Sequence, residues 1–247
     1  MRNSNLRVGV FSAFELKVLA CVFMLIDHIG VILLPEITAL RYIGRLAFPL
    51  FAYFIAEGCR YTKNKLRRFL SVFVLGVICE LGFVIFLKAY YGNILLTFSA
   101  SILLIYLMDE VKKAFIKSKV TGVLMTILLV LFVVAVYFYC EYVGLDYGFF
   151  GVLTPALALL FDNIDNFSIK LYNRVNRKSV SLFMFSLGLL FVSFFENVLS
   201  YQLLCLLSLP LLMLYNGERG KYKFKYGFYL FYPLHLVILE RVALVLR

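Results

Sequence analysis

The stretch FELKVLACVFMLIDHIGVILL, residues 14–34, decides the fold class because it is apolar over the length of a membrane span. About 20 consecutive apolar residues in a helix cross a hydrocarbon core ~30 Å thick. Asp27 and His28 nevertheless lie inside this run, where an ionisable side chain is costly to bury. The second of the two histidines, His235, also lies in an apolar stretch. These polar residues are the first candidates for a functional site.

Composition indicates a membrane protein throughout the chain. Hydrophobic residues make up 63% of the 247 residues, whereas soluble domains carry about 45–50%. The runs do not alternate in segments of ~10 residues, as a transmembrane β-barrel would require. We therefore predict an all-α fold, a polytopic transmembrane helical bundle.

The net charge of +11 comes from basic residues in short loops. Such residues set orientation and meet anionic membrane lipid, so we expect no nucleic-acid partner.

Apolar runs separated by charged segments predict about nine spans in a single integral-membrane domain, residues 1–247. Pro155 is expected to kink the sixth span without breaking it, because neighbouring helices can satisfy the freed carbonyl. No internal repeat or separate soluble domain is visible. The nine spans are predicted near 14–34, 42–59, 66–88, 94–108, 121–141, 147–161, 179–195, 197–215 and 227–246.

Loop charges predict the orientation of the chain in the cell's inner (cytoplasmic) membrane. Basic loops alternate with loops that have almost no Lys or Arg, which is the positive-inside pattern. It places the N-terminus in the cytoplasm and, with an odd number of spans, the C-terminus outside. The first apolar run lacks a small-residue cleavage site, so we interpret it as a retained helix. The basic loops are 60–68, 109–119, 170–178 and 218–225.

The cysteines and the common motifs give little information about chemistry. Five scattered cysteines without CxxC or Cys/His spacing are expected to be buried small hydrophobes, not a disulfide or a metal site. GxSxG, HExxH, P-loop and GxGxxG patterns are absent from the sequence. What remains is a set of ionisable residues within the predicted spans: Lys17, Asp27, His28, Arg45, Glu57, Glu80 and His235.

The spacing of these residues favours a general-base site. Lys17 and His28 are eleven residues apart, which returns them to one helix face about 16 Å apart along the axis. Arg41 and Arg45 also share a face and would bind an anionic group or compensate Asp27. A histidine with a carboxylate and a cation nearby has the parts of general-base catalysis.

Structural roles are the alternative for the same residues. Asp27, His28 and Arg45 would then only hold helices together. Glu57 would be a solvated helix-end carboxylate paired with Arg60, whereas Glu80 lies in the middle of the third predicted span, where solvation is not expected. His235 would be a satisfied core residue.

Three segments resemble the TraX family, membrane proteins named for N-terminal acetylation of F-pilin. They are LKVLACVFMLIDHIG (16–30), RYIGRLAFPLFAYFIAEGCRYTKN (41–64) and YLFYPLHLVIL (229–239), and the resemblance also includes LDYGFFGVL (145–153). The first segment also resembles the larger acyltransferase-3 group, in which a basic residue, ten intervening residues and a histidine occupy the first helix. Lys17 and His28 meet that pattern. Glu57 stands where that group usually has serine, so its role departs from the group's.

The resemblance implies a membrane acetyltransferase that uses acetyl-CoA as donor and an amine or hydroxyl acceptor, such as a pilin-like peptide N-terminus, a surface glycan or a lipid. Under it, His28 is the general base, and Asp27 and Arg45 orient the site or stabilise the oxyanion. No metal is required. The residues expected to bind the donor are Lys17, Glu57, Arg60, Lys63, Arg67 and Arg68, and those expected around the site or on the acceptor side are Glu80, Asp146, Tyr232 and His235.

Two other functions fit the polar residues. A proton-coupled transporter or exporter would use Asp27, His28 and Glu80 as a relay, although the internal repeat of many transporters is not visible. A non-enzymatic assembly factor for surface pili would need none of these residues to be reactive. Binding of acetyl-CoA separates the first function from the other two.

Overall fold

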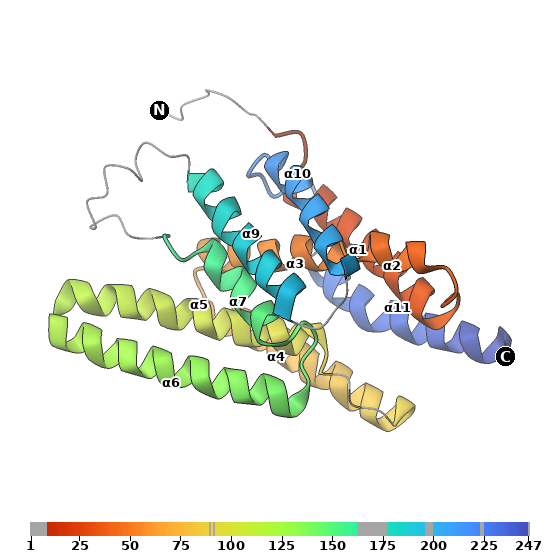
Figure 1. The fold of residues 1–247 in the computed structure, drawn as a ribbon, viewed down its shortest axis with the longest axis horizontal. Coiled ribbons are helices and arrows are strands. Elements are labelled where there is room, and N and C mark those ends of the chain that lie inside the picture. The colour runs from red at the N-terminus through yellow and green to blue at the C-terminus, as the bar shows by residue number, and fades with distance from the viewer. Residues whose placement is uncertain are drawn as a thin grey trace. The chain divides into compact units, whose positions relative to one another are not determined.

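The computed structural model describes residues 9–88, 90, 92–162, 177–195, 200–222 and 225–246. These residues are almost entirely helical and contain no β-strand (Figure 1). The chain forms two compact units, one of residues 1–54 and 198–247 and one of residues 55–197. Helix α3, Ala47–Tyr61, contributes residues to both. The single domain expected from the sequence stays a prediction.

The first unit is built around α1, Ala13–Ile32, which packs on α2, Thr38–Gly44, and on α11, Lys225–Leu246. A capping box starts α1, because Ser12 and Glu15 satisfy each other's backbone N–H groups. The rings of Phe14 and Phe228 are in contact near the starts of α1 and α11, and His28 meets His235 further along both. The two helices therefore run in the same direction. The unit also contains a 3₁₀ helix, Ser200–Leu207, and α10, Ser208–Met213.

The second unit contains α4, Lys65–Gly82, continued by a π-helical turn, Phe83–Leu87. Helices α5, Ile94–Lys117, and α6, Lys119–Val143, form a hairpin joined at Ser118 (Figure 1). Helix α7, Gly148–Ala158, packs tightly on α9, Arg177–Phe195, where Gly188 lies against Thr154. Small residues at such a crossing let two backbones approach closely.

Six described helical segments are long and apolar enough to cross a membrane, so the prediction of a polytopic helical membrane protein is confirmed. The first helix, α1, has 20 residues but carries Glu15, Lys17 and Asp27, and α7 and the segment Tyr201–Met213 are shorter. The count of nine spans therefore stays a prediction. The six segments are Thr38–Tyr61, Lys65–Phe86, Ile94–Lys117, Lys119–Val143, Arg177–Phe195 and Gly227–Leu246.

Some predicted boundaries were wrong. The fourth run does not end at residue 108, because α5 continues through most of the predicted basic loop to Lys117. The second run is interrupted at Arg45 between α2 and α3, whereas α7 passes through Pro155 unbroken. Most of the predicted loop 170–178 and the start of the eighth run lie outside the described residues. All five cysteines are buried with free thiols.

Candidate functional site

The two histidines of the chain meet in the first unit. His28 Nδ1 lies 3.2 Å from Nε2 of His235, and the two rings meet edge to face with centroids 4.9 Å apart. His28 comes from α1 and His235 from α11, so 207 sequence positions separate the pair. His235 is 4% exposed. The predicted general base therefore has a second imidazole as its immediate neighbour.

Backbone carbonyls fix which ring nitrogens carry protons. His28 Nδ1 lies 2.8 Å from the Met24 carbonyl, and His235 Nδ1 lies 2.8 Å from the Phe231 carbonyl. A carbonyl only accepts, so each Nδ1 donates, and Nε2 of a neutral ring holds the lone pair. Nε2 of His235 can then accept from the Nδ1–H of His28. Nε2 of His28 makes no hydrogen bond to another described residue and is the nitrogen available to take a proton.

Aromatic rings hold His235 in place. Phe231 stacks on it nearly parallel, with centroids 4.9 Å apart, and Tyr232 lies 6.0 Å away. Lys17 also faces α11, with its ammonium 6.0 Å from the ring centroid of Phe228 and 5.1 Å from that of Phe54. Lys17 and His28 thus both contact α11, as their predicted common face requires.

Asp27 pairs with the arginine expected to compensate it. Its Oδ2 lies 2.5 Å from Nη1 of Arg41, while its Oδ1 is buried and makes no hydrogen bond to a described residue. Gly44 lies directly against this carboxylate, and a Cβ there would overlap the side chain of Asp27. Arg45, 7% exposed, lies over the ring of Tyr201 at 5.3 Å. Asp27 and Arg41 therefore tie α1 to α2.

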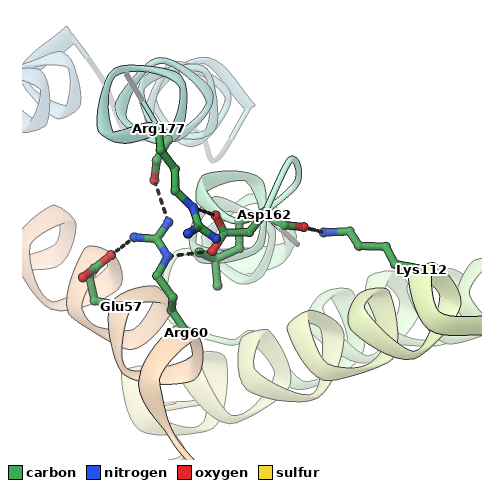
Figure 2. Close-up of polar contacts among 7 residues, drawn as sticks. Glu57, Arg60, Lys112, Asp162 and Arg177 are labelled. Carbon is green, nitrogen blue, oxygen red and sulfur yellow. Dashed lines mark hydrogen bonds and ion pairs between the residues drawn. The ribbon is translucent and has the colours of Figure 1, made fainter. Parts of the chain in front are cut away.

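In the second unit, Glu57 and Arg60 belong to a buried network of charged residues (Figure 2). Arg60 Nη1 donates to Glu57, Nε donates to Asp162 Oδ2 at 2.6 Å, and Nη2 lies 3.5 Å from Ser181. The other oxygen of Asp162 accepts from Nε of Arg177 at 2.7 Å. The predicted pairing of Glu57 with Arg60 is confirmed, but Glu57 is 7% exposed, so its expected solvation was wrong.

Lys112 of α5 completes this network from the opposite side (Figure 2). Its ammonium donates to the backbone carbonyls of Leu159 at 3.1 Å and Asp162 at 2.8 Å. These carbonyls follow the end of α7, where a cation is favourable because the last carbonyls of a helix lack partners. The network therefore joins α3, the end of α7 and α9 through ion pairs, and Lys112 adds α5 through its hydrogen bonds to backbone carbonyls.

The predicted donor-binding arginines 67 and 68 differ in their surroundings. Arg68 Nη2 donates to the carbonyl of Ile55 at 3.0 Å, and its guanidinium lies against Gly58, so it packs on α3. Arg67 is exposed at the start of α4, where its backbone N–H is capped by Asn64. Lys63 is exposed beside it. Arg67 and Lys63 are therefore the more accessible cations of this segment.

Both carboxylate oxygens of Glu80 accept hydrogen bonds from the connection between α4 and α5. One carboxylate oxygen accepts from the backbone N–H of Gly92 at 3.2 Å, and the other accepts from the backbone and side-chain amides of Asn93 at 3.0 and 2.7 Å. Glu80 lies within the candidate span Lys65–Phe86, two residues before α4 passes into the π-helical turn. Asp146 joins the same connection through its backbone, since its N–H donates to Gly92 and its carbonyl accepts from Thr97.

Sequence reasoning missed three members of the charged network. Asp162, Arg177 and Lys112 lie far from Arg60 in the sequence, and no motif relates them. A useful signal was the scarcity of acidic residues, 14 against 25 basic ones, which makes an Asp after a long apolar run notable.

Within the described residues, no three His, Cys, Asp or Glu side chains gather as a metal site would need.

Comparison with known proteins gives one family over nearly the whole chain. The model of the family described as "TraX protein" matches residues 12–243. A probable fimbrial assembly protein FimC, serogroup H1, of Dichelobacter nodosus is 24% identical over 96% of this chain and 98% of its own length. An uncharacterized protein of Rickettsia prowazekii (strain Madrid E) is 41% identical over 30% of this chain and 28% of its own. No solved structure matches.

Proposed function

Because the chain belongs to the TraX family, we propose that it is an integral membrane acetyltransferase that moves an acetyl group from acetyl-CoA to an amine or hydroxyl acceptor. The observation that carries the proposal is the 2.8 Å contact of His28 Nδ1 with the Met24 carbonyl, from which we assign the tautomer of His28. Its Nδ1–H is held by the Met24 carbonyl and faces His235, so Nε2 is left with the lone pair. A histidine arranged in this way is suited to act as a general base.

In the proposed reaction, Nε2 of His28 takes the proton of the acceptor hydroxyl, or of a neutral amine, as that group attacks the thioester carbonyl. The tetrahedral intermediate collapses, the carbon–sulfur bond breaks, and the coenzyme A thiolate takes the proton back from His28. The products are the acetylated acceptor and free coenzyme A. While His28 is an imidazolium, its Nδ1–H donates more strongly to the Met24 carbonyl and to Nε2 of His235, which stabilises the charge.

The donor is proposed to bind through cations near the cytoplasmic face. Arg67 and Lys63 are both exposed. The guanidinium of Arg67 can bind a phosphate of coenzyme A through two hydrogen bonds, and the ammonium of Lys63 can bind one as a single positive charge. Arg60 and Arg68 already hold acceptors of the protein itself, so we assign them to positioning α3 and α4. Lys17 keeps its proposed role as a cation at the cytoplasmic end of α1.

Acetyl-CoA binding tests the proposal directly. The purified protein in nanodiscs is titrated with acetyl-CoA and with acetate plus ADP as a control, and labelled acetyl transfer to added amines and alcohols is followed. Saturable binding of acetyl-CoA together with transfer supports an acetyltransferase. Failure of acetyl-CoA to bind folded protein at millimolar concentration overturns it.

One observation favours a second candidate, a non-enzymatic fimbrial assembly factor. The relative from Dichelobacter nodosus carries the name of a probable fimbrial assembly protein and aligns over nearly its whole length. An assembly factor would support surface fimbriae after His28→Gln substitution, whereas an acetyltransferase whose product is needed would not. The transporter alternative gains no support, because the carboxylate of Glu80 is occupied by Gly92 and Asn93.

The orientation is also part of the proposal. The shared direction of α1 and α11 agrees with termini on opposite sides of the inner membrane. The positive-inside pattern then puts the N-terminus in the cytoplasm and the C-terminus outside. A reporter fused after Arg247 should be active outside the cytoplasm, and a cytoplasmic reporter there would contradict the odd number of spans.

A further inference from the structure

An apolar groove of about 660 Å³ runs along the seam between α1 and α11 in the first unit. The side of α1 contributes Phe14, Val18, Cys21, Val22 and Leu25. The side of α11 and the segment before it contribute Tyr222, Gly227, Phe228, Leu230, Phe231 and Leu234. None of the described residues that line the groove is charged. Its volume lies in the range of ligand sites, about 300–1,000 Å³.

The groove faces outward along its length. Val18 and Val22 of α1 are 40% and 45% exposed, and Leu230 and Leu234 of α11 are 57% and 47% exposed. The α11 wall belongs to Gly227–Leu246, one of the six segments able to cross a membrane. Surface of this kind on a membrane-spanning helix meets hydrocarbon, so the surrounding bilayer is the natural source of an occupant.

The length of the groove fits a single acyl chain. From Phe14 to Leu25 is eleven residues, which is about 16 Å along a helix at 1.5 Å per residue. One leaflet contributes half of the hydrocarbon core, or about 15 Å. The groove thus extends from the start of α1, where the predicted cytoplasmic interface lies, to the depth at which an acyl chain of that leaflet ends.

Two described cations lie at the interface end of the groove. The ammonium of Lys17 lies 6.0 Å from the Phe228 ring, and that of Lys221 lies 5.8 Å from the Tyr222 ring. The carboxylate of Glu15, the nearest acid in sequence, is held by Ser12 in the capping box. Towards the deep end the groove is lined by Phe231, whose ring also stacks on His235, and by Leu234.

We propose that this groove binds one acyl chain of an anionic membrane phospholipid, with the headgroup phosphate at Lys221 and Lys17. Apolar walls of matched length and cations at one end are the complement of such a lipid. The bound acyl chain packs on one face of the Phe231 ring. The same ring stacks on His235, so the acyl chain helps to hold Phe231 against that histidine. The proposal does not depend on acetyl transfer, because it concerns binding alone.

The test measures phospholipid retained per protein chain by native mass spectrometry. Wild-type protein is delipidated in mild detergent and then offered phosphatidylglycerol or phosphatidylcholine. We expect one phosphatidylglycerol per chain. Val22→Trp fills the groove and should abolish this binding, whereas Val237→Trp, an equally apolar change on α11 at a residue that does not line the groove, should retain it.

Headgroup selectivity is tested at Lys221 alone, since Lys17 is also a candidate for the phosphates of acetyl-CoA. Lys221→Gln should weaken phosphatidylglycerol binding about fivefold, the effect of roughly 1 kcal/mol per cation near a membrane surface. Equal lipid retention by Val22→Trp and Val237→Trp would overturn the site. Loss of a dimer in Val22→Trp with unchanged lipid content would also overturn it, because a second copy of the chain would then cover the groove.

Discussion

The histidine pair of the first unit and the carboxylates of the second unit are both polar groups in apolar helices, but they use their hydrogen-bonding capacity differently. Each oxygen of Glu80 and of Asp162 accepts from a donor of the protein. His28 instead has one nitrogen bound and one without a hydrogen bond to a described residue. A polar group whose atoms all have hydrogen-bond partners holds helices together. A ring that is held in place by one nitrogen and keeps a lone pair on the other can react. The comparison therefore separates structural residues from the catalytic candidate.

Replacing His28 should give the largest effect on activity. A general base contributes typically 10²–10⁴-fold to a rate, so His28→Gln should lower acetyl transfer at least ~10²-fold while donor binding and folding persist. His235→Gln is the matched control, because the glutamine oxygen can still accept from Nδ1 of His28, and it should cost much less. Single-turnover transfer and acetyl-CoA titration of both variants measure this. Near wild-type transfer by His28→Gln would make that imidazole structural.

Replacing Asp162 should give the largest effect on stability. Asp162→Asn leaves Arg60, whose side chain is 11% exposed, without its carboxylate partner on that side. Removing one partner of a buried ion pair costs about 3–5 kcal/mol. Arg177→Gln is the control, because Arg177 is 49% exposed and water can replace its contact. Thermal unfolding in detergent should show a clear drop for Asp162→Asn and little change for Arg177→Gln. Equal effects would mean that the network contributes little.

These groups also show how far the sequence leads. Apolar runs and loop charges predict a helical membrane protein because hydrophobicity and length determine whether a helix can span. The eleven-residue spacing placed Lys17 and His28 on one face, and both contact α11. Partners from distant segments could not be predicted, because Asp162 is 102 positions from Arg60 and His235 is 207 from His28. Only the packing of helices brings such residues together.

The role of Glu80 illustrates the same limit at short range. An acidic residue within an apolar run suggested a functional group at the centre of a span. The helix continues through a π-helical turn to Leu87, and the chain then folds back, so the carboxylate meets the backbone of Gly92 and Asn93. A turn that brings N–H groups to a carboxylate depends on backbone conformation, which residue spacing along an apolar run does not encode.

A smaller effect is expected where the carboxylate of Asp27 meets α2. Gly44 lies directly against that carboxylate, so the methyl group of Gly44→Ala must displace Asp27 or the helix. Overpacking of this kind costs about 1–3 kcal/mol. Gly82→Ala is the matched control on α4, because a Cβ there meets nothing within 4 Å. Thermal unfolding of both variants should show destabilisation for Gly44→Ala only. Equal behaviour of the two would contradict the close contact between α1 and α2.

The smallest effect is expected at Arg67, which sharpens the contrast between bound and accessible cations. Arg67 is exposed, whereas Arg68 donates to Ile55 and lies against Gly58. An exposed ion pair contributes little, so Arg67→Gln should raise the KM for acetyl-CoA by up to about fivefold. The kcat at saturation should not change, since a contact made equally in ground and transition states sets affinity alone. Arg68→Gln should instead lower the unfolding temperature. If Arg67→Gln leaves KM unchanged, the donor's phosphates bind elsewhere on the cytoplasmic face.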